Sequence, residues 1–541
     1  MTNVDDHANK TRGFSSVVSC PRGYALKLLC CLVAFLALTG LFGRATRLRQ
    51  RRATPLALAQ AAHARWLACP DDVKASQNSY RSVARLVQWL DALPLERRAD
   101  ACRDAGLVVE MDTMDELGLY RFIIADKVPT YRLMRCHMRS GIGVPVVAWR
   151  PNDGSDHRDM LRPPEGIFAP ATAVLEPGSG DQWRLRFLSP YRRETVTMEG
   201  RAYPLAANFT APTARIARQA EPLRRTGFHG MLNSSAIARR EKLYLMQRYD
   251  PNRIPLLMVH GLQSTPVSFS NLNNDLLADP VIYSRYQIWQ YHYPTGTPVL
   301  QNAAVLRRVL KQTLSTLDPR GRDFATNHLV VLGHSMGGIM THTLICDSGY
   351  RLWDSVITAR PEMFACDAKT SSIVNATFLF EREKRVRRAI LISVPHRGST
   401  IADNWLGDLG QTLYRADREV QEAFRSLVEN HLDQINPFLV KLVKEGKISS
   451  IRTLSANSPA LMALAAIPPA VPFHSIIGQR NRGPVHMGND GVVAYSSSHL
   501  DGAESEAIVR FGHETFLHAD AVAEIKRILH AHLETYDQGE A

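Results

Sequence analysis

The sequence predicts an α/β fold, in which a mostly parallel sheet is flanked by helices. Five short apolar runs alternate with helix-length segments from residue 254 onward: Ile254–Val259, Tyr286–Tyr291, His328–Leu332, Ala389–Val394 and Phe473–Gly478. Such runs between helical patterns are typical of buried parallel strands that crossover helices connect. A second observation supports this class, because one of these runs leads directly into a glycine-flanked serine and then into a helical pattern.

The part of the chain before this pattern has a different texture. Residues 53–105 are predicted to be helical, since Val83, Leu86, Val87 and Leu90 recur at helical spacing. Residues 106–215 contain short apolar runs between Gly- and Pro-rich turns, which predicts a β-rich accessory domain. We expect residues 216–252 to be a linker and residues 253–541 to be the catalytic domain.

Residues 1–52 form a basic tail around an apolar segment at residues 24–42. The tail contributes +7 to the net charge of +13. About 20 apolar residues can span a bilayer, and a basic stretch before an apolar run is also typical of a secretory signal. A buried core helix is the alternative. We expect an apolar N-terminal helix that anchors or exports the protein, with its bulk at the bacterial inner membrane or in the periplasm.

The composition argues against several other classes of protein. The positive charge is concentrated in the N-terminal tail, and no zinc-finger spacing, RNA-binding signature or phosphate-binding loop is present, so we expect no nucleic-acid partner. The eight cysteines show no CxxC pair, and we expect buried free thiols, with a single Cys69–Cys102 bridge as the alternative. We expect no metal and no organic cofactor. The oligomeric state is left open.

The serine turn is the most informative motif of the chain. His328–Leu332 runs into Gly333-His334-Ser335-Met336-Gly337, and a helical pattern follows. A strand, a sharp turn and a helix around GxSxG form the nucleophile elbow, in which small residues on both sides let the chain turn closely. Ser335 is therefore the predicted nucleophile, and Gly333 and Gly337 are the predicted glycines of the elbow.

A nucleophilic serine needs a base and an acid, which are expected in the chain order serine, acid, histidine. Asp490 lies in a Gly-flanked turn after the late strand Phe473–Gly478, and His513 lies between the last apolar run and the last helical pattern. We predict that Asp490 orients His513 and that His513 is the base. Alternatives by residue type are Asp501 for the acid, and His334, His396 and His518 for the base.

Two backbone N–H groups are expected to form an oxyanion hole. Met336 follows the nucleophile and is the first predicted donor. Leu262 is the second, because it follows His260-Gly261 directly after the early strand Ile254–Val259. Gly261 would let the backbone approach the substrate, and we expect His260 to hold this loop rather than to act as a base.

Three segments of the chain resemble bacterial lipases and esterases of the α/β-hydrolase superfamily, including its GPI inositol-deacylase-like branch. They are Leu256–Gly261, Gly333–Gly338 and Ser393–Ser399, and the resemblance covers about residues 252–537. It implies the α/β-hydrolase fold and serine-dependent hydrolysis of lipid-like carboxylic esters, and it gives the segment Pro395–Ser399 a structural role. The loop after His260-Gly261 lacks the further glycine of many lipases, which leaves the shape of the acyl pocket open.

We therefore expect a serine hydrolase that forms an acyl-enzyme on Ser335 and releases it to water. An acyltransferase or thioesterase on the same three residues is one alternative, and a catalytically inactive membrane-tethered scaffold is another. Apolar residues recur every fourth position at Ile401, Trp405, Leu409 and Leu413, so residues 400–470 are predicted to form either a cap over the site or a core helix.

Overall fold

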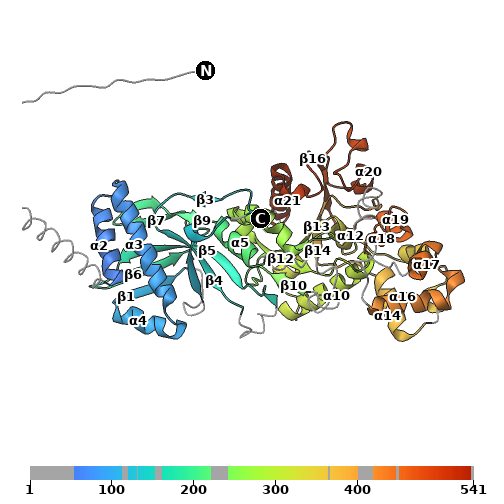
Figure 1. Ribbon diagram of the computed structural model, residues 1–541, viewed down its shortest axis with the longest axis horizontal. Helices are drawn as coiled ribbons and strands as arrows, with labels where there is room; N and C mark the ends of the chain where they lie inside the picture. Colours follow the sequence, from blue (N-terminus) through green and yellow to red (C-terminus); the bar gives the residue numbers. More distant parts are fainter. Residues whose placement is uncertain are drawn as a thin grey trace, which may run out of the picture.

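The computed structural model describes residues 54–112, 120–130, 132–152, 161–220, 242–363, 366–399, 418–445 and 450–537. Within these ranges the chain forms two larger sheets, one from residues before 220 and one from residues after 242. Figure 1 shows the two sheets next to each other along the long axis of the molecule, with the helices α14, α16 and α17 at the far end of the second sheet.

The second sheet has the predicted α/β architecture. Its seven strands have the order β10-β12-β11-β13-β14-β15-β16, and every neighbouring pair is parallel except β10 and β12. All residues of β11, β12, β13 and β15 are buried, which explains why these strands are rich in apolar residues on both faces. The strands span Lys242–Leu245 (β10), Ile254–Val259 (β11), Tyr286–His292 (β12), Leu329–His334 (β13), Val386–Ile392 (β14), Phe473–Gly478 (β15) and Ser505–Val509 (β16).

Helices cover both faces of this sheet, and alternate residues of a strand face opposite layers. On β11, Leu257 and Val259 pack into the core on the α10 side, whereas Leu256 and Met258 pack into the core on the α21 side. The first layer includes α10 (Val299–Leu317), α12 (Met336–His342), α13 (Arg351–Val356) and α14 (Ala368–Phe378). The second layer includes α8 (Ser270–Leu277), α9 (Pro280–Arg285) and α21 (Ala519–Asp537).

The structure corrects the predicted linker at residues 216–252. Helix α5 (Thr210–Gln219) extends into its start, and β10 near its end is the antiparallel edge strand of the second sheet. The second sheet therefore begins at Lys242 rather than after residue 252. A four-residue edge strand carries too short a pattern to be separated from the polar residues around it.

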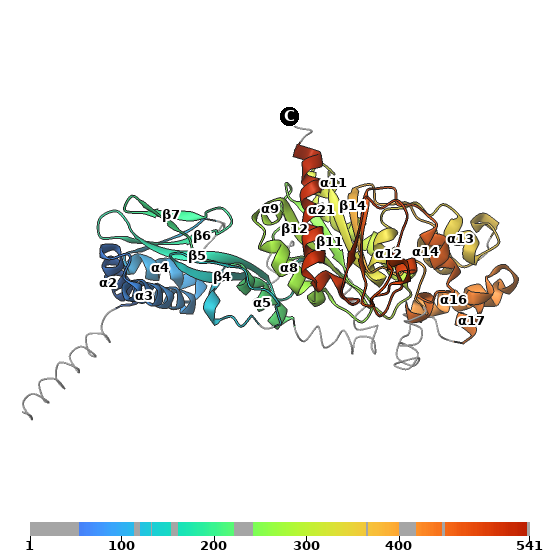
Figure 2. The same cartoon turned by 90° about the horizontal axis from the view of Figure 1, so that it is seen from above.

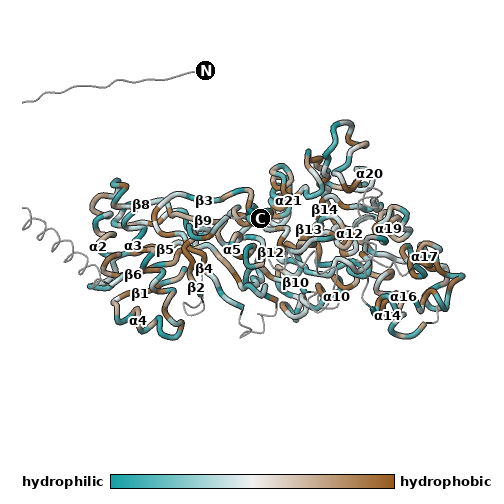
Figure 3. Tube along the Cα trace, in the orientation of Figure 1, coloured by the Kyte–Doolittle hydropathy of each residue, from teal (hydrophilic) through white to brown (hydrophobic). Residues whose placement is uncertain are grey.

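The first sheet contains five strands in the order β1-β6-β5-β4-β2. It packs against α3, whose Leu86, Val87 and Leu90 are fully buried in one core with strand residues such as Phe122 and Phe187. The predicted helical and β-rich regions thus share a core, and Figure 2 shows α2, α3 and α4 along one side of the sheet. Figure 3 shows hydrophobic stretches along β4 and β5.

The elements of this accessory part have the following bounds. The helices are α2 (Pro55–Ala68), α3 (Val73–Ala92), α4 (Arg98–Asp104) and α5. The strands of the sheet are β1 (Leu107–Met111), β2 (Arg121–Ile124), β4 (Val144–Arg150), β5 (Ile167–Pro177) and β6 (Trp183–Leu188). Two small two-stranded sheets pair β3 (Met138–Arg139) with β9 (Ala207–Asn208) and β7 (Thr195–Met198) with β8 (Arg201–Pro204).

The described part of the predicted cap is helical. It contains α16 (Arg418–Asn430), α17 (Pro437–Lys444), α18 (Ser450–Thr453) and α19 (Pro459–Ala465). Phe424 of α16 packs edge-on against Phe378 of α14, and the carbonyl of Ile467 after α19 accepts a hydrogen bond from His342 of α12. These helices therefore rest on the α10 layer of the second sheet. The predicted stripe from Ile401 to Leu413 lies outside the described residues.

The N-terminal predictions also fall outside the described part of the chain, since residues 24–42 are not among them. Of the helices that are described, none is long and apolar enough to cross a membrane. Cys69 and Cys102 are both free thiols, as are Cys136, Cys346 and Cys366. Within the same residues, no group of three His, Cys, Asp or Glu side chains is arranged to hold a metal ion.

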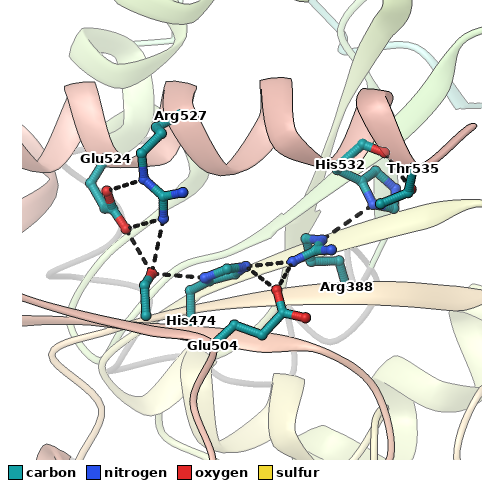
Figure 4. A network of polar contacts seen from close by, with 8 residues as sticks. Arg388, His474, Glu504, Glu524, Arg527, His532 and Thr535 are labelled. Carbon is teal, nitrogen blue, oxygen red and sulfur yellow. Dashed lines mark hydrogen bonds and ion pairs between the residues drawn. The ribbon is translucent and has the colours of Figure 1, made fainter. Parts of the chain in front are cut away.

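A buried polar network joins β14, β15 and β16 to α21 (Figure 4). Arg388, which is 6% exposed, donates hydrogen bonds to His474 Nε2 at 2.6 Å and to His532 Nδ1 at 3.3 Å, and it also pairs with Glu504. Because an arginine only donates, His474 must carry its proton on Nδ1, which donates to Ser505 at 2.8 Å. Both histidines are therefore held neutral next to a cation.

The network should make the protein sensitive to acid. Burial, reinforced by Arg388, lowers the pKa of His474 to about 4 and that of His532 to about 3. Both pKa values lie below 6.5, the ordinary value of the unfolded chain. As the pH falls below 6.5, the histidines of the unfolded chain are therefore protonated before those of the folded protein. The free energy of unfolding decreases until the pH reaches the folded-state pKa values. Between pH 7 and pH 5 we expect a loss on the order of 2 kcal/mol per histidine.

Urea unfolding, followed by tryptophan fluorescence at pH 7 and pH 5, tests this expectation. His474→Gln can still accept from Arg388 and donate to Ser505, so the shift of its midpoint between the two pH values should be smaller than that of the wild type. His486→Gln, at an exposed position on the loop before Asp490, serves as the control and should keep the wild-type shift. Equal shifts in the wild type and His474→Gln would contradict the expectation.

Candidate active site

Ser335 lies at a sharp turn between β13 and α12. Its backbone has φ 55° and ψ −127°, a region that residues with a side chain rarely adopt and that is found where the surrounding structure enforces it. The Ser335 N–H donates to the carbonyl of Ile392 on β14 at 2.9 Å, and the Gly338 N–H donates to the Ser335 carbonyl at 2.9 Å. These two bonds hold the strained turn at the carboxyl edge of the sheet.

The predicted glycines of the elbow are required by close backbone contacts. A Cβ on Gly337 would collide with the carbonyl oxygens of Val259 and His260 at the end of β11. A Cβ on Gly333 would collide with Thr341 and would lie only 2.5 Å from the Gly338 Cα. Any side chain at either position would therefore push α12 away from the sheet.

The structure brings the three predicted catalytic side chains together. His513 Nε2 lies 2.8 Å from Ser335 Oγ, and His513 Nδ1 lies 2.8 Å from Asp490 Oδ2. A carboxylate can only accept, so His513 carries its proton on Nδ1 and presents the Nε2 lone pair to the serine hydroxyl. In this arrangement His513 can take the hydroxyl proton of Ser335.

Asp490 is held as a carboxylate. Its side chain is buried, and burial alone would raise its pKa. The hydrogen bond from His513, the positive charge of this ring when it is protonated, and two backbone N–H groups outweigh burial and lower the pKa below its ordinary value. These N–H groups belong to Val492 and Val493, which donate to Asp490 Oδ1 at 2.9 and 2.7 Å. The Gly-flanked turn thus fixes one carboxylate oxygen and leaves the other for His513.

His334, an alternative base by residue type, has a different place in the site. Burial lowers its pKa to about 3, so the ring is neutral. Its Nε2–H donates to the His513 carbonyl at 2.9 Å, and its ring packs edge-on against Phe516 at a centroid distance of 4.8 Å. His334 therefore supports the loop that carries His513.

A second contact that supports this loop was not predicted from the sequence. Thr515 Oγ1 donates to the Gly512 carbonyl at 2.9 Å and lies 2.8 Å from the hydroxyl of Ser393 at the end of β14. Ser393 has a φ of 49°, so it is a second strained serine at this edge of the sheet. Neither hydroxyl was assigned a role from the sequence, because Ser393 only begins the segment Ser393–Ser399 and was not considered separately, and Thr515 stands in no motif.

The predicted oxyanion loop passes directly over the serine. A Cβ on Gly261 would lie 2.9 Å from Ser335 Cβ and 3.1 Å from His334 Nδ1, so only a glycine leaves room here. Leu262 follows this contact, and Met336 is the first residue of α12, where a backbone N–H has no partner within the helix. Both predicted donors thus come from segments next to Ser335.

His260 is fully buried beneath Tyr293. The two rings stack at a centroid distance of 4.4 Å, and the Tyr293 hydroxyl donates to the His260 carbonyl at 2.5 Å. Burial lowers the pKa of His260 to about 3, which leaves it neutral. These contacts fix the start of the oxyanion loop.

The remaining alternatives for the acid and the base have other partners. The exposed side chain of Asp501 lies 3.1 Å from His499 Nε2, and His518 Nδ1 lies 3.6 Å from Asp520. His396 is buried with its ring 5.5 Å from that of His342. None of these interactions involves Ser335.

Comparison with known proteins finds no matching family model and no curated relative. Solved structures to which this chain is similar include a Bacillus licheniformis lipase, BlEst2 in its mature form, at 15% identity and a TM-score of 0.31, over 53% of this chain and 97% of that chain. EstA from Clostridium botulinum matches at 14% identity and a TM-score of 0.30, over 54% of this chain and 93% of that chain. The thioesterase domain of the curacin biosynthetic pathway matches at 14% identity and a TM-score of 0.27, over 52% of this chain and 92% of that chain.

Proposed function

We propose that this protein is a serine hydrolase of the α/β-hydrolase superfamily that cleaves carboxylic esters, including lipid-like esters. The observation that carries the proposal is the chain of contacts from Asp490 through His513 to Ser335, with 2.8 Å at each step. It supports a nucleophile, a base and an orienting acid in the arrangement that acyl transfer needs.

In the proposed reaction, Ser335 Oγ attacks the ester carbonyl while His513 Nε2 takes its proton. Asp490 stabilises the resulting imidazolium, and the backbone N–H groups of Leu262 and Met336 donate to the oxyanion. His513 then gives its proton to the leaving alcohol, and the acyl group remains on Ser335. Water, deprotonated by His513, releases the acid and restores the serine.

A panel of substrates tests the reaction and its scope. We expect the full chain to hydrolyse p-nitrophenyl esters, and acyl lengths from two to sixteen carbons would define the acyl preference. Parallel thioesters would show whether a thioester is the better substrate, and added alcohols would show whether the acyl group is transferred rather than released to water. No cleavage of any ester or thioester by folded protein would contradict the proposal and favour the inactive scaffold.

We further propose that residues 24–42 anchor or export the protein, so that its bulk lies outside the bacterial cytoplasm. The apolar length of the segment and the basic residues around it support this location. Membrane fractionation of cells that express the full chain, compared with a chain lacking residues 1–52, tests it. Equal recovery of both in the cytoplasmic fraction would contradict it.

A further inference from the structure

A segment of the accessory part lies on the second sheet's helix α8. We call residues 132–139 the strap. The Met134 N–H donates to Asn271 Oδ1 at 2.7 Å, and the Asn274 side chain donates to the Arg135 carbonyl at 2.9 Å. Arg132 has a φ of 65°, which is uncommon for a residue with a side chain, and its carbonyl accepts from Asn271 at 3.2 Å. The first half of the strap is thus held to α8, whereas its last two residues, Met138 and Arg139, pair with β9.

The strap also supplies both partners of a buried carboxylate. The side chain of Asp275 on α8 is 3% exposed. Its Oδ2 accepts from Arg135 Nε at 2.9 Å and from Arg135 Nη2 at 2.5 Å, while its Oδ1 lies 2.7 Å from His137 Nε2. Burying a carboxylate to this extent costs free energy unless such partners balance its charge. The strap provides these partners for Asp275 of α8.

The same guanidinium reaches the loop that carries His513. Arg135 Nη2 also donates to the carbonyl of Leu517 at 3.2 Å. Leu517 ends the short helix η9 (Thr515–Leu517), which begins two residues after His513, and its own N–H donates to the Glu514 carbonyl at 3.0 Å. The cation therefore bridges α8 and the His513 loop.

The residues packed around η9 connect it to His513. Phe516 of η9 lies between Phe269, at a centroid distance of 5.2 Å, and His334, at 4.8 Å. His334 in turn donates to the His513 carbonyl. Loss of the contact at Leu517 would free one end of η9 and with it the backbone that orients His513.

We infer, on the basis of the proposed function, that Arg135 is a positioning residue for His513 and that the accessory part of the chain completes the support of the active site. Arg135 donates its side-chain hydrogen bonds to Asp275 and Leu517 and not to Ser335, Asp490 or His513, so its effect passes through Asp275 and Leu517. Because a displacement of about 1 Å at reacting groups can cost about 100-fold in rate, we expect removal of the guanidinium to lower kcat 10- to 100-fold with KM nearly unchanged.

Arg135→Met, which keeps the length of the side chain but not its charge, is the test variant. Arg139→Met is the matched control, since Arg139 lies on the same strap but donates only to carbonyls of the accessory part, at Leu205, Pro190 and Arg193. Rates are expressed per serine that reacts with a fluorophosphonate, which removes differences in folded fraction. Arg139→Met should then keep the wild-type kcat.

Arg135→Lys provides a second variant if Arg135→Met does not fold. A lysine can pair with Asp275, but its compact ammonium cannot bridge Asp275 and Leu517 as the planar guanidinium does. We expect its kcat to lie between those of the wild type and Arg135→Met. A kcat equal to that of the wild type in either Arg135 variant would overturn the inference.

Hydrogen exchange separates this inference from the proposed function. The amides of Leu517 and His518, which donate to the carbonyls of Glu514 and Thr515, should exchange faster in Arg135→Met or Arg135→Lys than in the wild type and Arg139→Met. Unchanged exchange in folded Arg135 variants would show that Arg135 does not hold the loop that carries His513, whether or not the protein is an esterase. A wild type without hydrolytic activity would instead overturn the proposed function.

Discussion

Replacing Ser335 by alanine is expected to lower kcat/KM for ester hydrolysis by about 10⁴- to 10⁶-fold. The hydroxyl is the only group of the proposed mechanism that forms a covalent bond to the substrate, and alanine leaves His513 and the oxyanion loop in place. The residual rate would come from substrate binding and the backbone donors alone. Initial rates on the preferred p-nitrophenyl ester would determine the ratio of the two kcat/KM values, provided that the assay resolves rates that differ by at least five orders of magnitude.

Ser284→Ala is the matched control for this variant. Ser284 is exposed on α9, and its hydroxyl donates only to the carbonyl of Val281 at 2.9 Å. Its removal should leave both kcat and KM at their wild-type values. Activity of Ser335→Ala within 10-fold of the wild type would show that another group is the nucleophile.

Replacing Asp490 by asparagine is expected to lower kcat by about 10³- to 10⁴-fold with little change in KM. The carboxylate accepts a hydrogen bond from His513 Nδ1–H and keeps the Nε2 lone pair directed at Ser335. An amide can instead donate to Nδ1, which would place the ring proton on Nε2 and remove the base. It also carries no charge to stabilise the imidazolium.

Asp501→Asn is the control for the acid, because Asp501 follows the same late strand in sequence but is exposed and pairs with His499. We expect wild-type kcat from this variant. The two predictions would both be wrong if Asp501→Asn lost activity and Asp490→Asn kept it. Circular dichroism of each variant would show that the loss does not arise from unfolding.

The positions of Ser335, Asp490 and His513 could be predicted because each depends on a local pattern and on chain order. Parallel strands bring their carboxyl ends to one edge of a sheet, so loops after different strands meet there. The turn around Asp490 is recognisable from its flanking glycines, and the elbow around Ser335 from the strand and helix beside it. The catalytic roles of Ser335 and Asp490 are tested by the variants above.

Other features could not be predicted, because they depend on contacts between distant segments. The edge strand β10 is defined by its antiparallel pairing with β12, which lies more than 40 residues further along the chain, and its four residues carry no distinct periodicity. Arg135 is one of many arginines, and nothing near it in sequence indicates that it reaches Leu517, 382 residues away. The first feature arises when the second sheet forms, and the second arises only once the two sheets lie next to each other.

The accessory part of the chain showed no candidate catalytic residue in its sequence. Its contacts give it a role nonetheless, because the strap neutralises Asp275 and reaches the His513 loop. If Arg135 positions His513 as inferred, the second sheet alone would be a less active enzyme than the full chain. The accessory part would then help to hold the active site in its working geometry.

The most direct test of the central claim is labelling of the full chain with a fluorophosphonate, followed by mass spectrometry of the modified peptide. We expect one label per protein molecule, attached to Ser335, with ester hydrolysis lost in proportion to labelling and no label on Ser335→Ala. A folded wild-type protein that hydrolyses esters but stays unlabelled at Ser335, or that carries its label on another serine, would show that Ser335 is not the nucleophile.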